Sequence, residues 1–181
     1  MVNTYIEFVK QYPILSSAIQ IGILGTIGEL MAVRIRMGKW YYFGPGPWKL
    51  PAKAFVWAFL GITFKYVFTG FYGFVASITR EGWWFSAAES NTYVRALSVS
   101  FFANIIYGPI FTTFHRFTDN YIEKKEMDWE SMKQVWWSLI WLWIPALTMI
   151  FCLPKYLQIG FLALLNILLG LVLGYFAVRK K

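Results

Sequence analysis

Residues 54–78 decide the class of this protein, because they read AFVWAFLGITFKYVFTGFYGFVASI and hold one charged side chain, Lys65. A helix of this length is about 37 Å long, which exceeds the roughly 30 Å of a bilayer's hydrocarbon core. Outward from this stretch, four more long apolar runs lie at residues 13–33, 93–113, 134–153 and 156–178. The sequence therefore predicts an all-α integral membrane bundle of about five transmembrane helices, forming one membrane domain over residues 1–181.

The composition agrees with a chain that faces lipid. Of the 181 residues 58% are apolar and only 14% are charged, whereas a soluble domain has about a quarter of its residues charged. The net charge of +8 would indicate nucleic-acid binding in a soluble protein, but in a membrane protein basic residues gather in cytoplasmic loops. We therefore expect a lipid bilayer as partner and no nucleic acid. The single cysteine, Cys152, cannot form a disulfide within the chain.

The basic residues predict the orientation. In the five-span topology twelve Lys and Arg residues fall on the side of the carboxyl terminus, and four fall on the other side, namely Lys10, Arg80, Arg95 and Lys155. By the positive-inside rule the amino terminus is outside and the carboxyl terminus is in the cytoplasm or matrix. The rule does not identify the membrane, for which we keep two expectations: the plasma (inner) membrane if the protein is prokaryotic, and the mitochondrial inner or peroxisomal membrane if it is eukaryotic. An alternative topology has the first segment lying on the surface as an amphipathic helix.

Among the polar side chains inside the predicted spans, four are candidate functional residues: Lys65, Glu29, Asn104 and Asn166. Ionisable groups at this depth are costly, so they normally face protein or water. In one interpretation these four residues line a path for a solute, and Lys65 selects anions. In the other they hold helices together, as buried amides commonly do. Glu29 has candidate partners in Lys65 and, nearer the interface, in Arg34 and Arg36.

Small residues and prolines predict how the helices pack and bend. Glycines let helix backbones approach closely, and they recur at helical spacing at Gly22, Gly25, Gly28, Gly170 and Gly174. The last two form a GxxxG motif, which fits contacts within the bundle and also a homo-oligomer. Pro109 and Pro145 interrupt the third and fourth spans, and each predicts a kink.

Motifs of enzymes are absent from the sequence. It has no Gly-rich phosphate loop, no HExxH or Cys-x-x-Cys pair, and one histidine, His115. We therefore expect no enzyme activity, no cofactor and no metal site.

Several short motifs follow one another in the order of a known family. They are Tyr12-Pro13, Gly22-x-Leu24-x-x-x-Gly28-Glu29, Tyr107-Gly108-Pro109-Ile110-Phe111, Trp143-Ile144-Pro145 and Phe151-x-Leu153-Pro154. In these the chain resembles the peroxisomal membrane protein 22 (Mpv-17) family, as a distant and perhaps prokaryotic relative. It departs from that family in the second span, which has Lys65, and at the carboxyl end, which lacks the Trp-Asn-x-Tyr-Leu-Ser element. The resemblance implies a small membrane protein with pore-like or metabolite-transport activity.

Two functional hypotheses follow. The first is a membrane channel or small-solute transporter, with a small solute or ion, in particular an anionic metabolite, as its partner. The second is a non-transporting membrane scaffold or assembly factor, in which the same polar residues only hold helices together.

Overall fold

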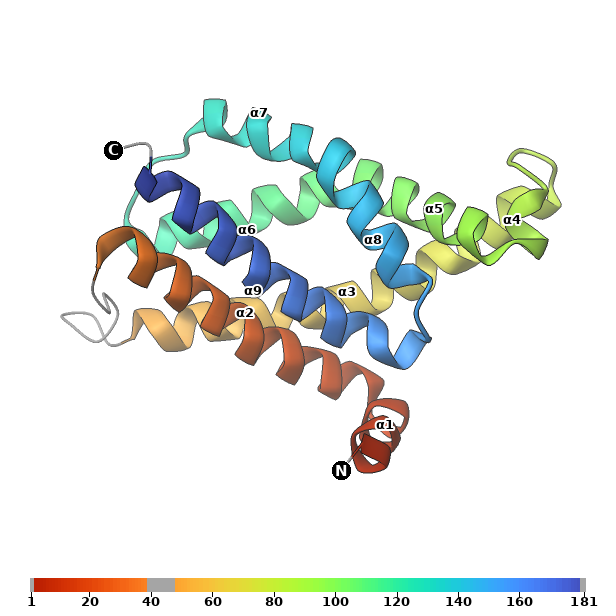
Figure 1. Cartoon of the computed structure of the whole chain (residues 1–181), viewed down its shortest axis with the longest axis horizontal. Coiled ribbons are helices and arrows are strands. Elements are labelled where there is room, and N and C mark those ends of the chain that lie inside the picture. The colour runs from red at the N-terminus through yellow and green to blue at the C-terminus, as the bar shows by residue number, and fades with distance from the viewer. Residues whose placement is uncertain (1, 39–47, 180–181) are drawn as a thin grey trace. The chain divides into compact units, whose positions relative to one another are not determined.

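The computed structural model describes residues 2–38 and 48–179, and every regular element within these ranges is helical (Figure 1). The all-α class expected from the sequence is thus confirmed for these residues. In chain order the elements are α1 (Val2–Gln11), α2 (Pro13–Met37), α3 (Lys49–Arg80), α4 (Ala87–Ser90), α5 (Thr92–Phe102), the π-helical η2 (Ala103–Tyr107), α6 (Gly108–Glu123), α7 (Trp129–Ser138), the π-helical η3 (Leu139–Trp143), α8 (Ile144–Phe151) and α9 (Lys155–Arg179).

Four helical stretches are long and apolar enough to cross a bilayer. They are Pro13–Ile35, Lys49–Arg80, Thr92–Glu123 and Trp129–Phe151, and each overlaps one of the first four predicted spans. The protein is therefore described here as an integral membrane protein. The fifth apolar run falls within α9, where the apolar stretch over residues with described side chains is Lys155–Leu168.

The third stretch is longer than the sequence predicted. The predicted span ends at residue 113, but α6 continues to Glu123 because the following segment is amphipathic, with polar and apolar side chains on opposite faces. Lys124, with φ of 54°, ends α6 in the left-handed conformation. Asp128 then begins α7 by accepting hydrogen bonds from the backbone N–H groups of Glu130 and Ser131. The polar connection between these helices is thus only a few residues long.

By its contacts the chain divides into two compact units. The first comprises Met1–Thr63 and Ile159–Lys181, and the second comprises Phe64–Gln158. The helix α3 contributes its first half to the first unit and its second half to the second, and α9 begins in the second unit and continues into the first.

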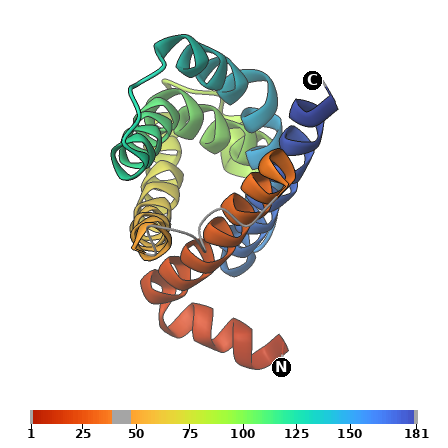
Figure 2. The same cartoon turned by 90° about the vertical axis from the view of Figure 1, so that its left-hand side faces the viewer.

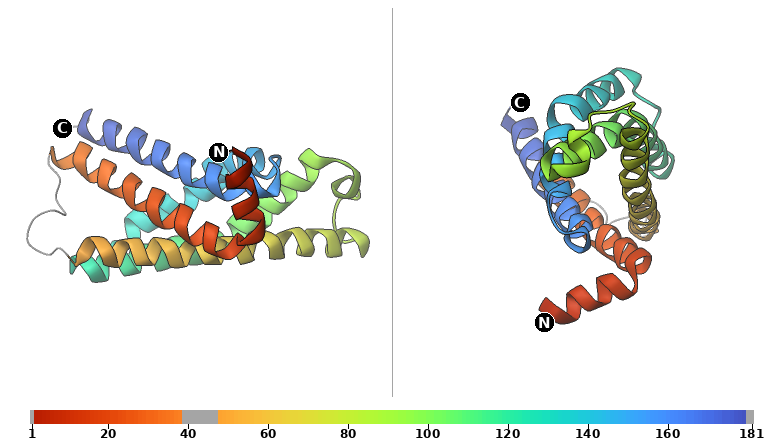
Figure 3. Two further views of the ribbon diagram at one scale, coloured as in Figure 1. Left: turned by 90° about the horizontal axis from the view of Figure 1, so that it is seen from below. Right: turned by 90° about the vertical axis from the view of Figure 1, so that its right-hand side faces the viewer.

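In the first unit α2 and α9 run side by side (Figures 1 and 3). Small residues of α2 lie where it contacts its neighbours. A Cβ at Gly22 would lie 3.1 Å from Ala58 Cβ of α3, and one at Gly28 would lie 3.2 Å from Ile167 Cγ1 of α9. Pro13 at the start of α2 separates it from α1, and the two helices meet at a sharp bend (Figure 3). The surroundings of Gly170 and Gly174 lie outside the residues whose side chains the structure describes.

In the second unit α5 packs along α8, and α6 lies beside α7 (Figures 1 and 2). The prolines predicted to kink their helices, Pro109 and Pro145, each lie two residues after the end of a π-helical segment, η2 and η3 respectively. A proline ring clashes with the carbonyl four residues earlier, and a wider π turn makes room for it. The hydroxyl of Ser100 donates to the carbonyl of Ile144, which fastens α5 to α8.

Candidate functional site

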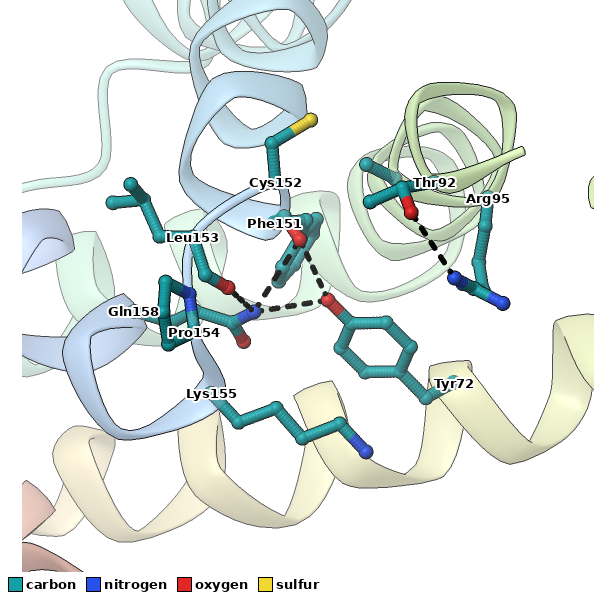
Figure 4. A pocket seen from close by; sticks show the side chains of 10 residues that line it. Tyr72, Thr92, Arg95, Phe151, Cys152, Leu153, Pro154, Lys155 and Gln158 are labelled. Atoms are coloured by element: carbon teal, nitrogen blue, oxygen red, sulfur yellow. Dashed lines mark hydrogen bonds between the residues drawn. The ribbon is translucent and has the colours of Figure 1, made fainter. Parts of the chain in front are cut away.

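The second unit contains a pocket of about 530 Å³, here called the Tyr72 pocket, between α3 and the ends of α5, α8 and α9 (Figure 4). One wall is formed by Tyr72 of α3, and a second by the start of α5. The third wall is the segment that connects the end of α8 to the start of α9. Its lining residues are Tyr72, Thr92, Arg95, Ala96, Phe151, Cys152, Leu153, Pro154, Lys155 and Gln158.

Backbone carbonyls at the end of α8 are occupied by two side chains of the pocket. The Tyr72 hydroxyl donates to the Phe151 carbonyl at 3.0 Å, and Gln158 Nε2 donates to the Leu153 carbonyl at 3.0 Å. The same Gln158 nitrogen donates to the Tyr72 oxygen at 2.9 Å, so the hydroxyl and the amide form one network (Figure 4). Gln158 is only 3% exposed. The network therefore satisfies the negative end of α8.

The two charged residues of the pocket are both cations. Lys155 Nζ lies 4.8 Å from the centre of the Tyr72 ring, in a cation–π arrangement. The Arg95 guanidinium donates to the Glu89 carbonyl at 3.2 Å and to the Thr92 hydroxyl at 3.4 Å. Among the described residues that line the pocket there is no carboxylate, and neither cation forms a salt bridge within the described part of the chain. The pocket thus presents positive charge without a protein counter-ion.

The backbone adds to this positive potential. The first residue of α5 is Thr92 and the first residue of α9 is Lys155, and both line the pocket. The amino-terminal end of a helix carries a positive partial charge. Two helices begin at the pocket and only one ends there. At the start of α5 the Asn91 side chain already accepts from the N–H groups of Tyr93 and Val94, and at the end of α8 the Phe151 carbonyl accepts from Tyr72. An anion is the charge type that this arrangement stabilises.

Lys65, which the sequence singled out, belongs to the same helix face as Tyr72. It lies at the middle of α3, sixteen residues after Lys49 and fifteen before Arg80. Seven residues are nearly two helical turns, so Lys65 and Tyr72 project from the same side of α3, about 10 Å apart along its axis. Lys65 is half-buried. Lys65 does not line the Tyr72 pocket itself.

Glu29 has its counter-ion within the first unit. Its carboxylate forms an ion pair with Lys53, and it accepts a hydrogen bond from Trp57 Nε1 at 3.2 Å. Lys53 is 2% exposed, although the sequence interpretation had placed it in the connection before the second span. Lys65, the partner considered from the sequence, is part of the other unit.

The two asparagines lie in different surroundings. Asn104 is buried on η2, where its Nδ2 donates to the Ser100 carbonyl at 2.9 Å and contacts the Ser100 hydroxyl at 3.3 Å. These hydrogen bonds stay within one helical stretch. Asn166 is half-buried on α9, in the first unit. Of the four predicted pathway residues, only Lys65 and Asn104 therefore belong to the unit that contains the Tyr72 pocket.

Sequence reasoning missed the residues that build the pocket. Arg95 and Lys155 were noticed only as two of the four basic residues on the side opposite the carboxyl terminus, and Tyr72 and Gln158 were not among the candidate site residues. One signal was available: Lys155 follows the break at Leu153-Pro154, so it had to lie at a helix start near the membrane surface.

Comparisons of the chain with family models, with curated proteins and with solved structures find no significant match.

Proposed function

We propose that this protein is a membrane channel or transporter that binds a small anionic solute at the Tyr72 pocket and moves it across the bilayer. The observation that carries the proposal is the pair of cations, Arg95 and Lys155, in a pocket with no carboxylate among its described lining residues. Lys155 is exposed and Arg95 is half-buried, so both cations can reach a ligand in the pocket. A solute anion would provide a counter-ion that the described lining residues do not.

The depth of the pocket fits an entrance. The 32 residues of α3 span about 48 Å, so about 9 Å of helix projects beyond the hydrocarbon core at each end if the helix is centred. Tyr72 lies eight residues, or about 12 Å, before Arg80. The pocket would then lie at the boundary between headgroups and hydrocarbon. In the proposed five-span topology with an outer amino terminus, this is the outer boundary.

Lys65 would provide a second positive position deeper in the membrane. A lysine at the centre of a span costs about 2.5 to 3.5 kcal/mol on insertion scales, and water or a passing anion lowers that cost. Because Lys65 lies on the Tyr72 side of α3, an anion released from the pocket would meet it next. We also propose a distant relationship to the peroxisomal membrane protein 22 family, whose pore-like or transport activity agrees with this function.

Anion flux into liposomes tests this function. The purified protein is reconstituted, uptake of a small organic anion is measured, and the parent is compared with Lys65→Met and with Arg80→Gln. Arg80→Gln is the matched control, because it removes one positive charge from an exposed site on the same helix. We expect Lys65→Met to lower flux about tenfold or more, and Arg80→Gln to leave it near the parent value. A folded Lys65→Met protein that transports as well as the parent would remove Lys65 from the route.

A second function, a non-transporting scaffold or assembly factor, is favoured by a different observation. Glu29 is paired with Lys53, and Asn104 donates to Ser100, so these polar groups are satisfied inside the protein. As a scaffold the protein would show no flux, and Glu29→Gln would weaken helix association without any transport phenotype. Parallel measurements of flux and of unfolding on Glu29→Gln separate the two functions.

A further inference from the structure

The donors and acceptors that remain available in the Tyr72 pocket identify the class of its ligand. The Tyr72 hydroxyl hydrogen is used by the Phe151 carbonyl, and the Gln158 amide hydrogens are used by carbonyl and hydroxyl oxygens. The Lys155 ammonium keeps its three N–H donors, because a cation–π contact occupies none of them. The Arg95 guanidinium has five N–H donors and uses two of them. The charged donors of Lys155 and Arg95 thus make up most of the open capacity, beside the Gln158 amide oxygen and the Thr92 hydroxyl hydrogen.

Charged N–H donors of this kind match oxyanions. A guanidinium presents parallel N–H groups that fit two oxygens of one carboxylate or phosphate, and a lysine adds a point charge. Such charge-assisted hydrogen bonds are roughly twice as strong as neutral ones. A halide offers no pair of oxygens, and a cation would meet only repulsion.

The remaining walls of the pocket are apolar. Phe151 is buried, and Ala96, Leu153 and Pro154 add further apolar surface to the lining. A volume of about 530 Å³ falls in the range of roughly 300 to 1,000 Å³ that small organic ligands occupy. An inorganic ion would leave this apolar surface uncovered.

From these features we infer that the Tyr72 pocket binds an organic oxyanion, a carboxylate or phosphate ester whose charged group contacts Arg95 and Lys155 and whose apolar part contacts Phe151 and Pro154. This inference rests on the proposed function and names its substrate class. Two sources share the same chemistry: a free organic anion in water, and the phosphate of an anionic lipid whose headgroup reaches the membrane boundary. Figure 4 shows the side chains that would contact the ligand.

Cys152 provides a direct readout of occupancy, because it lines the pocket, is exposed, and is the only cysteine of the chain. The rate at which N-ethylmaleimide alkylates Cys152 is measured in phosphatidylcholine nanodiscs. Benzoate and phenyl phosphate serve as probes, while benzyl alcohol and benzylammonium are the neutral and cationic controls. We expect saturable slowing by the two anions and none by the two controls. Equal slowing by benzyl alcohol, or no slowing by either anion at any concentration in either bilayer, would overturn the inference.

The variants test the assigned contacts. Lys155→Met and Arg95→Gln each remove a charge-assisted contact, which is typically a ten- to hundredfold loss of affinity, so the half-protecting concentration of benzoate should rise at least about tenfold. Arg80→Gln, outside the pocket, should leave it unchanged.

Each variant's rate with ligand is divided by its own rate without ligand, which cancels any change in the reactivity of the thiol. Lys155 is exposed and its ammonium group contacts the Tyr72 ring, so Lys155→Met keeps the test valid if Arg95→Gln fails to fold. If the half-protecting concentration of benzoate were unchanged in Lys155→Met, the assignment of Lys155 as a ligand contact would be overturned.

Bilayer composition separates the two sources. In nanodiscs that contain phosphatidylglycerol, a lipid occupant would slow alkylation before any benzoate is added, and Lys155→Met would restore the fast rate. A free anion would act equally in both bilayers. Either result supports an oxyanion site. Protection without any flux would keep this inference and remove the proposed transport function, whereas Lys65-dependent flux without protection would keep transport and remove this ligand site.

Discussion

The Lys155 ammonium group lies 4.8 Å from the centre of the Tyr72 ring, and the hydroxyl of the same tyrosine donates to the Phe151 carbonyl at 3.0 Å. One side chain thus stabilises a cation with its ring face and closes a helix end with its hydroxyl. This places the positive charge of the pocket next to a backbone whose negative end is already satisfied. The two contacts of Tyr72 support anion binding, because one holds the Lys155 cation at the pocket and the other bonds the Phe151 carbonyl. Both the stability of the pocket and its ligand binding should therefore depend on Tyr72.

Tyr72→Phe keeps the ring and removes the hydroxyl. The Phe151 carbonyl and the Gln158 amide each lose a partner, and losing one partner of a buried hydrogen bond costs about 1 to 3 kcal/mol. We expect the free energy of unfolding in detergent to fall by about this amount. Tyr66→Phe is the control, because Tyr66 is on the same helix and 62% exposed, and it should change stability little. Equal effects of the two variants would contradict the role of the network.

Glu29→Gln should destabilise the first unit strongly. It leaves Lys53, which is 2% exposed, without its carboxylate, and breaking one side of a buried ion pair costs about 3 to 5 kcal/mol. The double variant Glu29→Gln with Lys53→Met removes both charges and should recover most of that loss. A double-mutant cycle on unfolding in detergent measures the coupling. Additive effects of the two substitutions would show that the pair contributes nothing.

Gly25→Ala tests the contact between α2 and α3. A Cβ at Gly25 would lie 2.6 Å from the Trp57 ring, so the ring must move, and overpacking of this kind costs about 1 to 3 kcal/mol. At Gly70, within α3, a Cβ would meet nothing within 4 Å, so Gly70→Ala should stabilise the helix by about 0.5 to 1 kcal/mol. The two thermal midpoints should therefore shift in opposite directions. A destabilised Gly70→Ala protein would mean that a partner covers that face.

The start of α7 should depend on acid pH through Asp128. The backbone N–H of Ser131, followed by its hydroxyl and the N–H of Glu130, holds the pKa of the exposed Asp128 carboxyl below its ordinary value. Because the folded-state pKa is depressed, the stabilisation is complete above the ordinary value near 4 and is lost as the pH falls through the depressed one. The protection factors of the Glu130 and Ser131 amides, which are exchange rates corrected for the intrinsic rate at each pH, should fall in the parent as the pH is lowered. In Asp128→Asn, which keeps a capping oxygen but cannot titrate, this fall should be absent.

The membrane-crossing stretches could be predicted from the sequence because long apolar runs need no knowledge of their neighbours. The helical extension to Glu123 was missed, since hydropathy alone treats a polar segment as a connection although its apolar residues share one face. Kinks were expected at Pro109 and Pro145. The π turns before them could not be predicted, because they depend on backbone geometry that no residue type indicates.

Long-range partners were the least predictable part. Glu29 and Lys53 are 24 residues apart, and nothing local distinguishes Lys53 from a lysine in a loop. The Tyr72 pocket joins residues from α3, α5, α8 and α9, so no spacing along the chain reveals it. Lys65 was noticed because a charge in the middle of an apolar run is anomalous by itself, whereas Arg95 and Lys155 lie near helix ends, where cations are ordinary.

The most direct test of the central claim is uptake of benzoate by liposomes that contain equal amounts of parent, Arg95→Gln or Arg80→Gln protein. Arg95 lines the Tyr72 pocket and Arg80 does not, so both variants lose one charge but only one loses a ligand contact. We predict saturable uptake by the parent, a loss of about tenfold or more at subsaturating benzoate in Arg95→Gln, and near-parent uptake in Arg80→Gln. Uptake that is absent from the parent, or equal in all three proteins, would contradict the account.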